Sequence, residues 1–168
     1  RELLQSSKLM SEYIARLLRR ENRSVWIAQR EGRTKDGNDA THPGVLKMLA
    51  MGAGDDHQLH YFKKARIVPV AISYEYDPTD ALKMPQLLAE ANNEKYIKEK
   101  NEDFMTLLSG IMGQKKRIHI HIGKTLDTEI DDILAETDNT NKQIQALAQK
   151  IDDSIISNYR LWPTNFIA

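Results

Sequence analysis

The chain has 168 residues, and 40% of them are hydrophobic, so it can build a core and is not expected to be disordered throughout. Its 24 basic residues balance 24 acidic ones, which argues against a dedicated nucleic-acid binder, because such proteins carry a basic excess. The absence of cysteine excludes disulfides, thiolate metal sites and cysteine nucleophiles. The length predicts a single domain over residues 1–168.

Apolar spacing predicts helices where it repeats every three to four residues, and strands where it alternates or is continuous. In chain order it predicts a helix at 1–20, a buried strand at 24–28, a polar loop at 29–42, a helix from Pro43, a strand at 65–74, helices within 80–113, a strand at 117–122, a short helix around 130–134 and a helix at 141–160. Because helices alternate with strands, we expect an α/β fold, with a mostly parallel sheet flanked by helices. The segments 24–28, 67–73 and 117–122 would lie side by side in that sheet.

Proline and capping residues refine these limits. Pro43 suits the first turn of a helix, with Thr41 or His42 as its cap. Thr140 and Gln143 predict a capping box at the start of the last helix. Pro69 cannot donate to a sheet ladder, so its position predicts a sheet edge, a bulge or the start of a strand.

The loop at 29–42 is the segment with the clearest chemical character. It follows the predicted strand directly, carries Arg30, Arg33 and Lys35, and ends at the helix that begins near Pro43. Arginine side chains and the free N–H groups of a helix N-terminus both favour anions, so the loop predicts a phosphate or carboxylate site. The alternative is a solvated loop whose charges pair with each other.

Four segments resemble the glycerolphosphate and lysophospholipid acyltransferase family, and they follow one another along the chain in the family's order. Residues 31–37, Glu-Gly-Arg-Thr-Lys-Asp-Gly, are similar to the family's Glu-Gly-x-Arg-Ser block, and residues 67–70, Ile-Val-Pro-Val, to its Ile/Val-Pro-Val strand. Residues 43–47 are similar to the helix start after the loop, and residues 120–124 to a late strand that ends in Gly-Lys. The resemblance covers roughly residues 24–126.

One position departs from the family block. Gly32 and Arg33 are adjacent here, whereas the family has a residue between them. Either Glu31 or Arg30 can therefore fill the family's glutamate position.

The resemblance implies an acyltransferase of phospholipid biosynthesis. Such an enzyme moves a fatty acyl group from acyl-CoA or acyl-carrier protein to the hydroxyl of a glycerolphosphate or lysophospholipid acceptor. It implies that Arg33 holds the acceptor phosphate, that Lys35 adds charge and that Glu31 binds glycerol hydroxyls; Arg30, Gly32 and Thr34 complete the expected substrate-binding set. It implies no cofactor and no nucleic-acid partner. The full-length protein is expected in the cytoplasm, peripheral to the cytoplasmic membrane.

The family's catalytic His-x4-Asp block is missing from this sequence, because none of the five histidines has an aspartate five positions later. We therefore expect the catalytic residues upstream of Arg1, which makes this chain a substrate-binding fragment without its general base. The alternative is a noncatalytic anion-binding or lipid-surface module. A nucleotide-binding domain is disfavoured, since neither a Gly-x-x-x-x-Gly-Lys-Ser/Thr nor a Gly-x-Gly-x-x-Gly loop occurs.

Two histidine pairs have spacings that metal sites use. His119 and His121 share one face of a predicted strand, and His57 and His60 lie near two aspartates. Neither pair has an evident third ligand, so a polar strand face and a solvated loop are the favoured interpretations. His42, beside the basic loop, is a further candidate for substrate contact.

Overall fold

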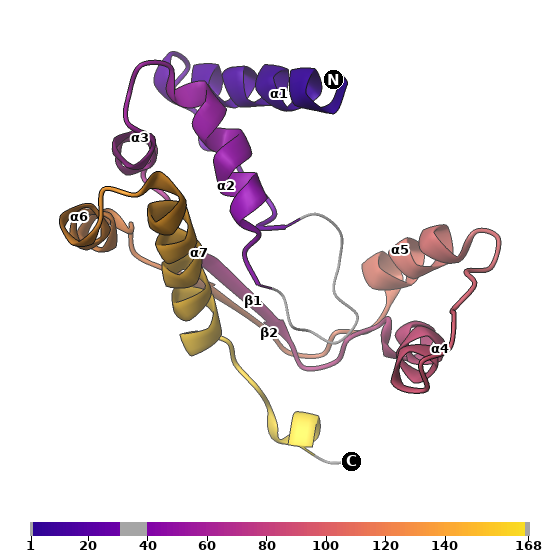
Figure 1. The fold of residues 1–168 in the computed structure, drawn as a ribbon. Coiled ribbons are helices and arrows are strands. Elements are labelled where there is room, and N and C mark those ends of the chain that lie inside the picture. Colours follow the sequence, from indigo (N-terminus) through magenta and orange to yellow (C-terminus); the bar gives the residue numbers. More distant parts are fainter. Residues whose placement is uncertain (1, 31–39, 167–168) are drawn as a thin grey trace. The chain divides into compact units, whose positions relative to one another are not determined.

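The computed structural model of the chain describes residues 2–30 and 40–166 (Figure 1). It is mostly helical, with 59% of residues in helices and 6% in strands. The elements are α1 (Glu2–Arg19), α2 (Pro43–Ala50), the 3-10 helix η1 (Met51–Ala53), α3 (Gln58–Ala65), β1 (Val70–Tyr74), α4 (Asp80–Ala91), α5 (Glu102–Met112), β2 (Ile118–Ile122), α6 (Asp127–Glu136), α7 (Thr140–Ser157) and the 3-10 helix η2 (Pro163–Phe166).

The sheet has two antiparallel strands, so the prediction of a mostly parallel α/β sheet is wrong. The N–H of Gly123 donates to the carbonyl of Pro69 at 2.9 Å, and the N–H of Glu75 donates to the carbonyl of Arg117 at 2.9 Å. The excursion through α4 and α5 thus leaves and re-enters at the same end of the sheet. An even number of helices between two strands can return the chain antiparallel, and apolar alternation carries no information on strand direction.

The segment 24–28 is extended but is not a strand, and it is not buried, which corrects two predictions. Trp26 is 72% exposed. Among the described residues the backbone of 24–28 makes no hydrogen bond, so this segment does not join the sheet in which it was expected to be a strand. The apolar face of β2 is likewise open, because its three isoleucines are exposed while His119 and His121 are half-buried.

The chain divides into two compact units, each described by itself below. Within the described residues the first comprises 2–30, 40–70 and 122–157, and the second comprises 71–121 and 158–166. The prediction of a single domain over residues 1–168 stays a prediction, since contact units can belong to one domain.

Unit 1 is built around the buried stripes of α6 and α7. The buried apolar side chains of α7 are Ile144, Leu147, Ala148 and Ile151, and Leu147 is completely buried together with Ile130 of α6 and Leu59 of α3. These side chains form one cluster with Leu46 of α2. Burying a leucine or isoleucine side chain contributes about 1.5–3 kcal/mol, so this cluster is the main stabilising feature of the unit.

The caps of the helices are set by individual side chains. His42 caps α2 as predicted, with its Nδ1 accepting the Gly44 N–H at 3.1 Å. The prediction of a capping box from Thr140 and Gln143 at the start of α7 is wrong, because the capping residue is Asn139, one position earlier. Asn139 Oδ1 accepts the Lys142 N–H at 3.1 Å, and the Gln143 amide instead donates to the carbonyl of Thr137 at 2.6 Å.

In unit 2 the carboxylate of Glu75 joins the strands to the C-terminal segment. Arg117 donates to it from Nε at 2.9 Å and from Nη2 at 3.0 Å, and the Thr164 hydroxyl donates to it at 3.0 Å. The side-chain amide of Asn165 donates to the Glu75 carbonyl at 2.8 Å. The hydrogen bonds from Arg117 and Thr164 lower the pKa of the Glu75 carboxyl to about 2, from an ordinary value of 4.5.

We expect Glu75→Gln to remove a stabilising contribution whose dependence on pH is defined. Because the pKa of the folded-state carboxyl is depressed, its contribution is fully present above pH about 4.5 and is lost as the pH falls through about 2. Thermal melts of wild type and variant at several pH values measure the difference. The gap in Tm should narrow as the pH falls from 4.5 towards 2, and Arg117→Ala should reproduce the behaviour of Glu75→Gln. A gap that is the same at all these pH values would contradict the role given to this ion pair.

Candidate functional site

Most of the residues predicted to bind substrate lie outside the described part of the chain. These are Glu31, Gly32, Arg33, Thr34 and Lys35. Arg30 is described and is half-buried at the point where the loop begins. Their roles therefore stay predictions, while the structure describes the two ends between which the loop is attached.

The two ends of the loop are joined by a backbone hydrogen bond. The His42 N–H donates to the carbonyl of Gln29 at 2.9 Å, which closes the base of the loop (Figure 1). The returning arm is held a second time at Thr41, whose N–H and hydroxyl donate to Asp152 Oδ1 of α7 at 2.8 and 2.6 Å. Both Thr41 and Asp152 are buried, so the attachment is shielded from water. Thr41 is thereby tied to α7 in the helical core of unit 1.

The base of the loop lies at the N-terminus of α2. Pro43 occupies the first turn, and His42 uses its ring nitrogen to satisfy the Gly44 N–H. Pro43 has no N–H, and the Val45 N–H donates to the His42 carbonyl at 2.9 Å, so the first turn contributes the positive end of the helix dipole and no free donor. A loop that carries Arg30, Arg33 and Lys35 and closes at such a helix end has the composition of an anion site.

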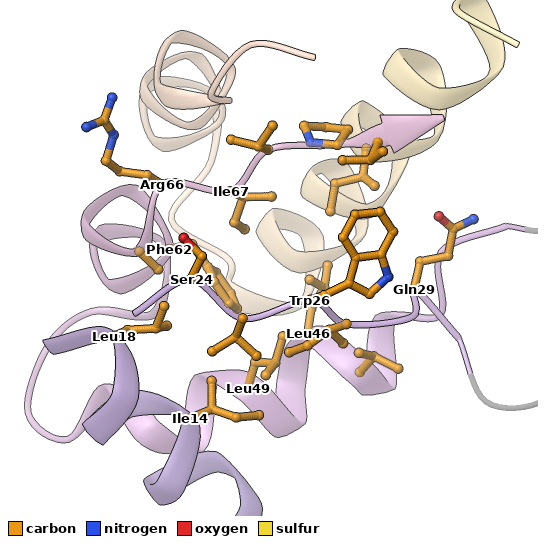
Figure 2. A pocket seen from close by; sticks show the side chains of 18 of the residues that line it. Ile14, Leu18, Ser24, Trp26, Gln29, Leu46, Leu49, Phe62, Arg66 and Ile67 are labelled. Atoms are coloured by element: carbon orange, nitrogen blue, oxygen red, sulfur yellow. The ribbon is translucent and has the colours of Figure 1, made fainter. Parts of the chain in front are cut away.

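An apolar hollow of about 640 Å³ lies next to the loop base, within unit 1. Figure 2 shows the extended segment with Ser24 and Trp26 crossing it, with Leu46 and Leu49 of α2 on one side and Ile67 on the other. Its volume is in the range of small-molecule sites.

The walls of this hollow carry open peptide groups as well as apolar side chains. One set of such groups is the unpaired backbone of 24–28. A second set belongs to Val68: the carbonyls of Ile67 and Pro69 on either side of it accept from Leu126 and Gly123, so the N–H and carbonyl of Val68 face away from those partners. An acyl chain would cover these groups without pairing them, at a cost of roughly 1–3 kcal/mol for each. Water or a further strand suits the hollow better, and we assign it no role in acyl binding.

The histidine pairs do not form metal sites with the residues described. His57 and His60 stack edge to face, with ring centroids 5.4 Å apart, beside Asp56. Asp56 is paired with Lys64 at 3.1 Å and Arg19 at 3.0 Å, and these partners lower the pKa of its carboxyl. In residues 2–30 and 40–166, no group of three or more histidine, aspartate and glutamate side chains is placed to hold a metal ion.

Asp152 is the residue of this region that the sequence analysis missed. It follows Ile151 in α7 and lies four residues after Ala148, so it falls within the buried stripe. An acid at a stripe position signals a buried acceptor, since burying a carboxylate is favourable only when it is hydrogen-bonded. Its partner, Thr41, could not be identified from spacing because 111 positions separate the two residues.

None of the helices in the described ranges combines the length and the apolar character that crossing a bilayer requires. No protein-family model, curated protein or solved structure matches the chain.

Proposed function

We propose that this chain is the acceptor-binding part of an acyltransferase of phospholipid biosynthesis. The reaction moves a fatty acyl group from a thioester donor, acyl-CoA or acyl-carrier protein, to the hydroxyl of a glycerolphosphate or lysophospholipid acceptor. The phosphate of the acceptor is held by the basic loop, with Arg33 as the main contact. The full-length protein works in the cytoplasm, at the surface of the cytoplasmic membrane.

One observation supports this proposal above the others. The hydrogen bond between Gln29 and His42 closes the loop at its base, directly at the N-terminus of α2. Loop closure of this kind limits how far Arg30, Arg33 and Lys35 can be from the helix end, because the chain between the fixed points is short. The cations of the loop and the positive end of the helix dipole then act on the same anion.

In this reaction the role of this part of the protein is to position the acceptor, and no reactive group is required of it. A planar guanidinium can hold two phosphate oxygens at once, which fixes the orientation of the acceptor as well as its place. Holding a hydroxyl in line with a thioester can contribute several kcal/mol to the lowering of the barrier. The general base is a separate requirement, which the five histidines of this sequence do not meet through a His-x4-Asp spacing.

A noncatalytic anion-binding module is the second candidate, and the missing His-x4-Asp spacing is the observation that favours it. Such a module would bind phosphate through the same loop. It would differ from the acyltransferase in having no turnover in the full-length protein.

Two measurements test the proposal. The 168-residue chain should bind glycerol 3-phosphate but not glycerol in a calorimetric titration, and it should give no product with acyl-CoA and an acceptor. The full-length protein should form the acylated product. Binding without turnover in the full-length protein would support the noncatalytic module instead. Equal heats for glycerol 3-phosphate and glycerol would refute the phosphate site, and turnover by the chain alone would refute the argument from the histidines.

A further inference from the structure

Helix α5 of unit 2 has its apolar side chains on the outside. Six large apolar side chains are between 42% and 77% exposed: Phe104, Met105, Leu107, Leu108, Ile111 and Met112. At about 100° per residue they cover one continuous arc of roughly 160° of the helix surface. We call this arc the α5 stripe. A helix that packs into a core by its apolar face would bury such a stripe.

The opposite side of α5 is made of small and polar residues, and it is this side that contacts the protein. Thr106 is the buried residue of the helix. A Cβ atom on Gly110 would lie 3.6 Å from Thr79 Cγ2, and one on Gly113 would lie 2.3 Å from Pro78 Cβ. Turning the helix to bury the stripe would put bulky side chains where little or no side chain fits. The outward direction of the stripe is therefore built into the packing of unit 2.

The charges around the stripe match an anionic surface. Residues 104–114 contain no charged side chain, and the basic excess beside them lies at the C-terminal end, at Lys115 and Lys116, because Glu102 and Asp103 offset the lysines before the helix. Lys115, next to the end of the helix, donates to the carbonyls of Ile111 and Gly113 at 3.2 and 3.1 Å and keeps a positive charge at that end. Residues 94–117 carry six basic and four acidic side chains within a chain of zero net charge.

We propose that the α5 stripe binds the surface of an anionic lipid bilayer, with α5 lying in the plane of the interface. Its phenylalanine, leucine, isoleucine and methionine side chains enter the boundary between headgroups and acyl chains, and the flanking lysines contact the headgroups. The proposal deepens the proposed function, on which it rests for its biological purpose, because a phospholipid acceptor has to be reached in a bilayer. The geometry of the stripe does not depend on that function.

The test uses vesicles made of equal amounts of phosphatidylcholine and phosphatidylglycerol, and sedimentation of the chain with them. The double variant Phe104→Ser/Ile111→Ser should reduce the partition coefficient at least about tenfold, because two apolar side chains no longer enter the interface. The matched control Leu3→Ser/Ile156→Ser removes two apolar side chains that are 81% and 70% exposed elsewhere, and it should leave binding unchanged. Circular dichroism checks that the variants keep their helices.

A second readout places the helix directly, because the chain has no cysteine and single cysteines can be labelled. An environment-sensitive fluorophore on Met112→Cys should shift to the blue with these vesicles and be quenched by lipids brominated in the acyl chain. The same label on Lys150→Cys of α7, an exposed position, should do neither.

Several outcomes would overturn the proposal. A failure of the wild-type chain to bind the vesicles would refute it. An equal loss of binding in the control variant, or a fluorophore at residue 112 whose emission does not change with vesicles, would also refute it. Concentration-dependent dimers that the Phe104→Ser/Ile111→Ser change abolishes, without vesicle binding, would make the stripe an interface between copies. Vesicle binding through α5 in a protein without acyl transfer would leave this proposal standing while refuting the proposed function, so the two can fail separately.

Discussion

Arg33→Ala is expected to lower the kcat/KM of the full-length enzyme for its phosphorylated acceptor by at least about tenfold. A charge-assisted hydrogen bond of the kind that an arginine makes to phosphate contributes about 1.5–3 kcal/mol, which corresponds to about ten- to a hundredfold. The loop that carries Arg33 closes at the N-terminus of α2 through Gln29 and His42, so loss of the guanidinium leaves Arg30, Lys35 and the helix dipole to attract the phosphate. Kinetic titration of the acceptor at fixed salt measures the effect, since salt screens phosphate contacts.

The control for this experiment has to be a lysine that the fold does not use. Lys115 belongs to a charge run that the sequence pattern assigns to solvent, but it is half-buried and its ammonium holds the carbonyl end of α5. Lys150→Ala, at an exposed position of α7, is the better control and should leave kcat/KM within about twofold, because exposed single charges contribute little.

The pattern of results also decides how the sequence block is aligned. If Arg33→Ala behaves as wild type while Arg30→Ala loses activity, then Arg30 is the phosphate contact and the block is displaced relative to the family. If neither arginine affects the acceptor, the loop is a charged connection and the phosphate site is refuted.

Asp152→Ala is expected to destabilise unit 1 by about 2–4 kcal/mol, the largest effect on stability that we predict for a polar residue. The carboxylate oxygen accepts from both the N–H and the hydroxyl of Thr41, at 2.8 and 2.6 Å, and both residues are buried. Alanine leaves two donors without a partner, and each buried unsatisfied group costs roughly 1–3 kcal/mol. Urea unfolding followed by circular dichroism gives the free energy of unfolding.

Two further variants separate the effect of losing these hydrogen bonds from the effect of the substitution itself. Asp153→Ala makes the same substitution one position along α7, where the side chain is exposed, and should cost less than about 0.5 kcal/mol. Asp152→Asn keeps an acceptor oxygen of nearly the same size and should fall between the two. Equal midpoints for Asp152→Ala and Asp153→Ala would show that the attachment of the loop arm at Thr41 contributes nothing to stability.

The same attachment shows where sequence reasoning reached its limit at the candidate site. The loop, its basic residues and the helix that follows it were predicted from local patterns, because Pro43 and His42 act on the residues next to them. The hydrogen bonds from His42 to Gln29 and from Thr41 to Asp152 span 13 and 111 positions, and no local pattern encodes them. The outward stripe of α5 was missed for a related reason. Apolar periodicity reports that a helix has two faces, not which face the protein contacts.

The sequence by itself determined most of the helices, but it missed α3 (Gln58–Ala65), where a solvated loop was expected around His57 and His60. Residues 1–20, the start at Pro43, the stripe around Ile130 and Ile133, and the long helix after Thr140 are all found within a few positions of where apolar spacing puts them. This succeeds because helix hydrogen bonds and side-chain neighbours lie within four residues of each other.

Only the tertiary structure decided how the strands pair and which apolar faces are covered. Strands obtain their hydrogen bonds from segments far along the chain, so the same alternation at Arg117–Ile122 fits a parallel or an antiparallel partner, and a buried or an open face. The contacts resolved both points. β2 runs antiparallel to β1 with its isoleucines exposed, and the extended segment at Ser24–Ala28 has no strand beside it in the described chain. The direction of a strand and the burial of its apolar face depend on the segments that pack against it, whereas apolar spacing describes only the side chains of the strand itself.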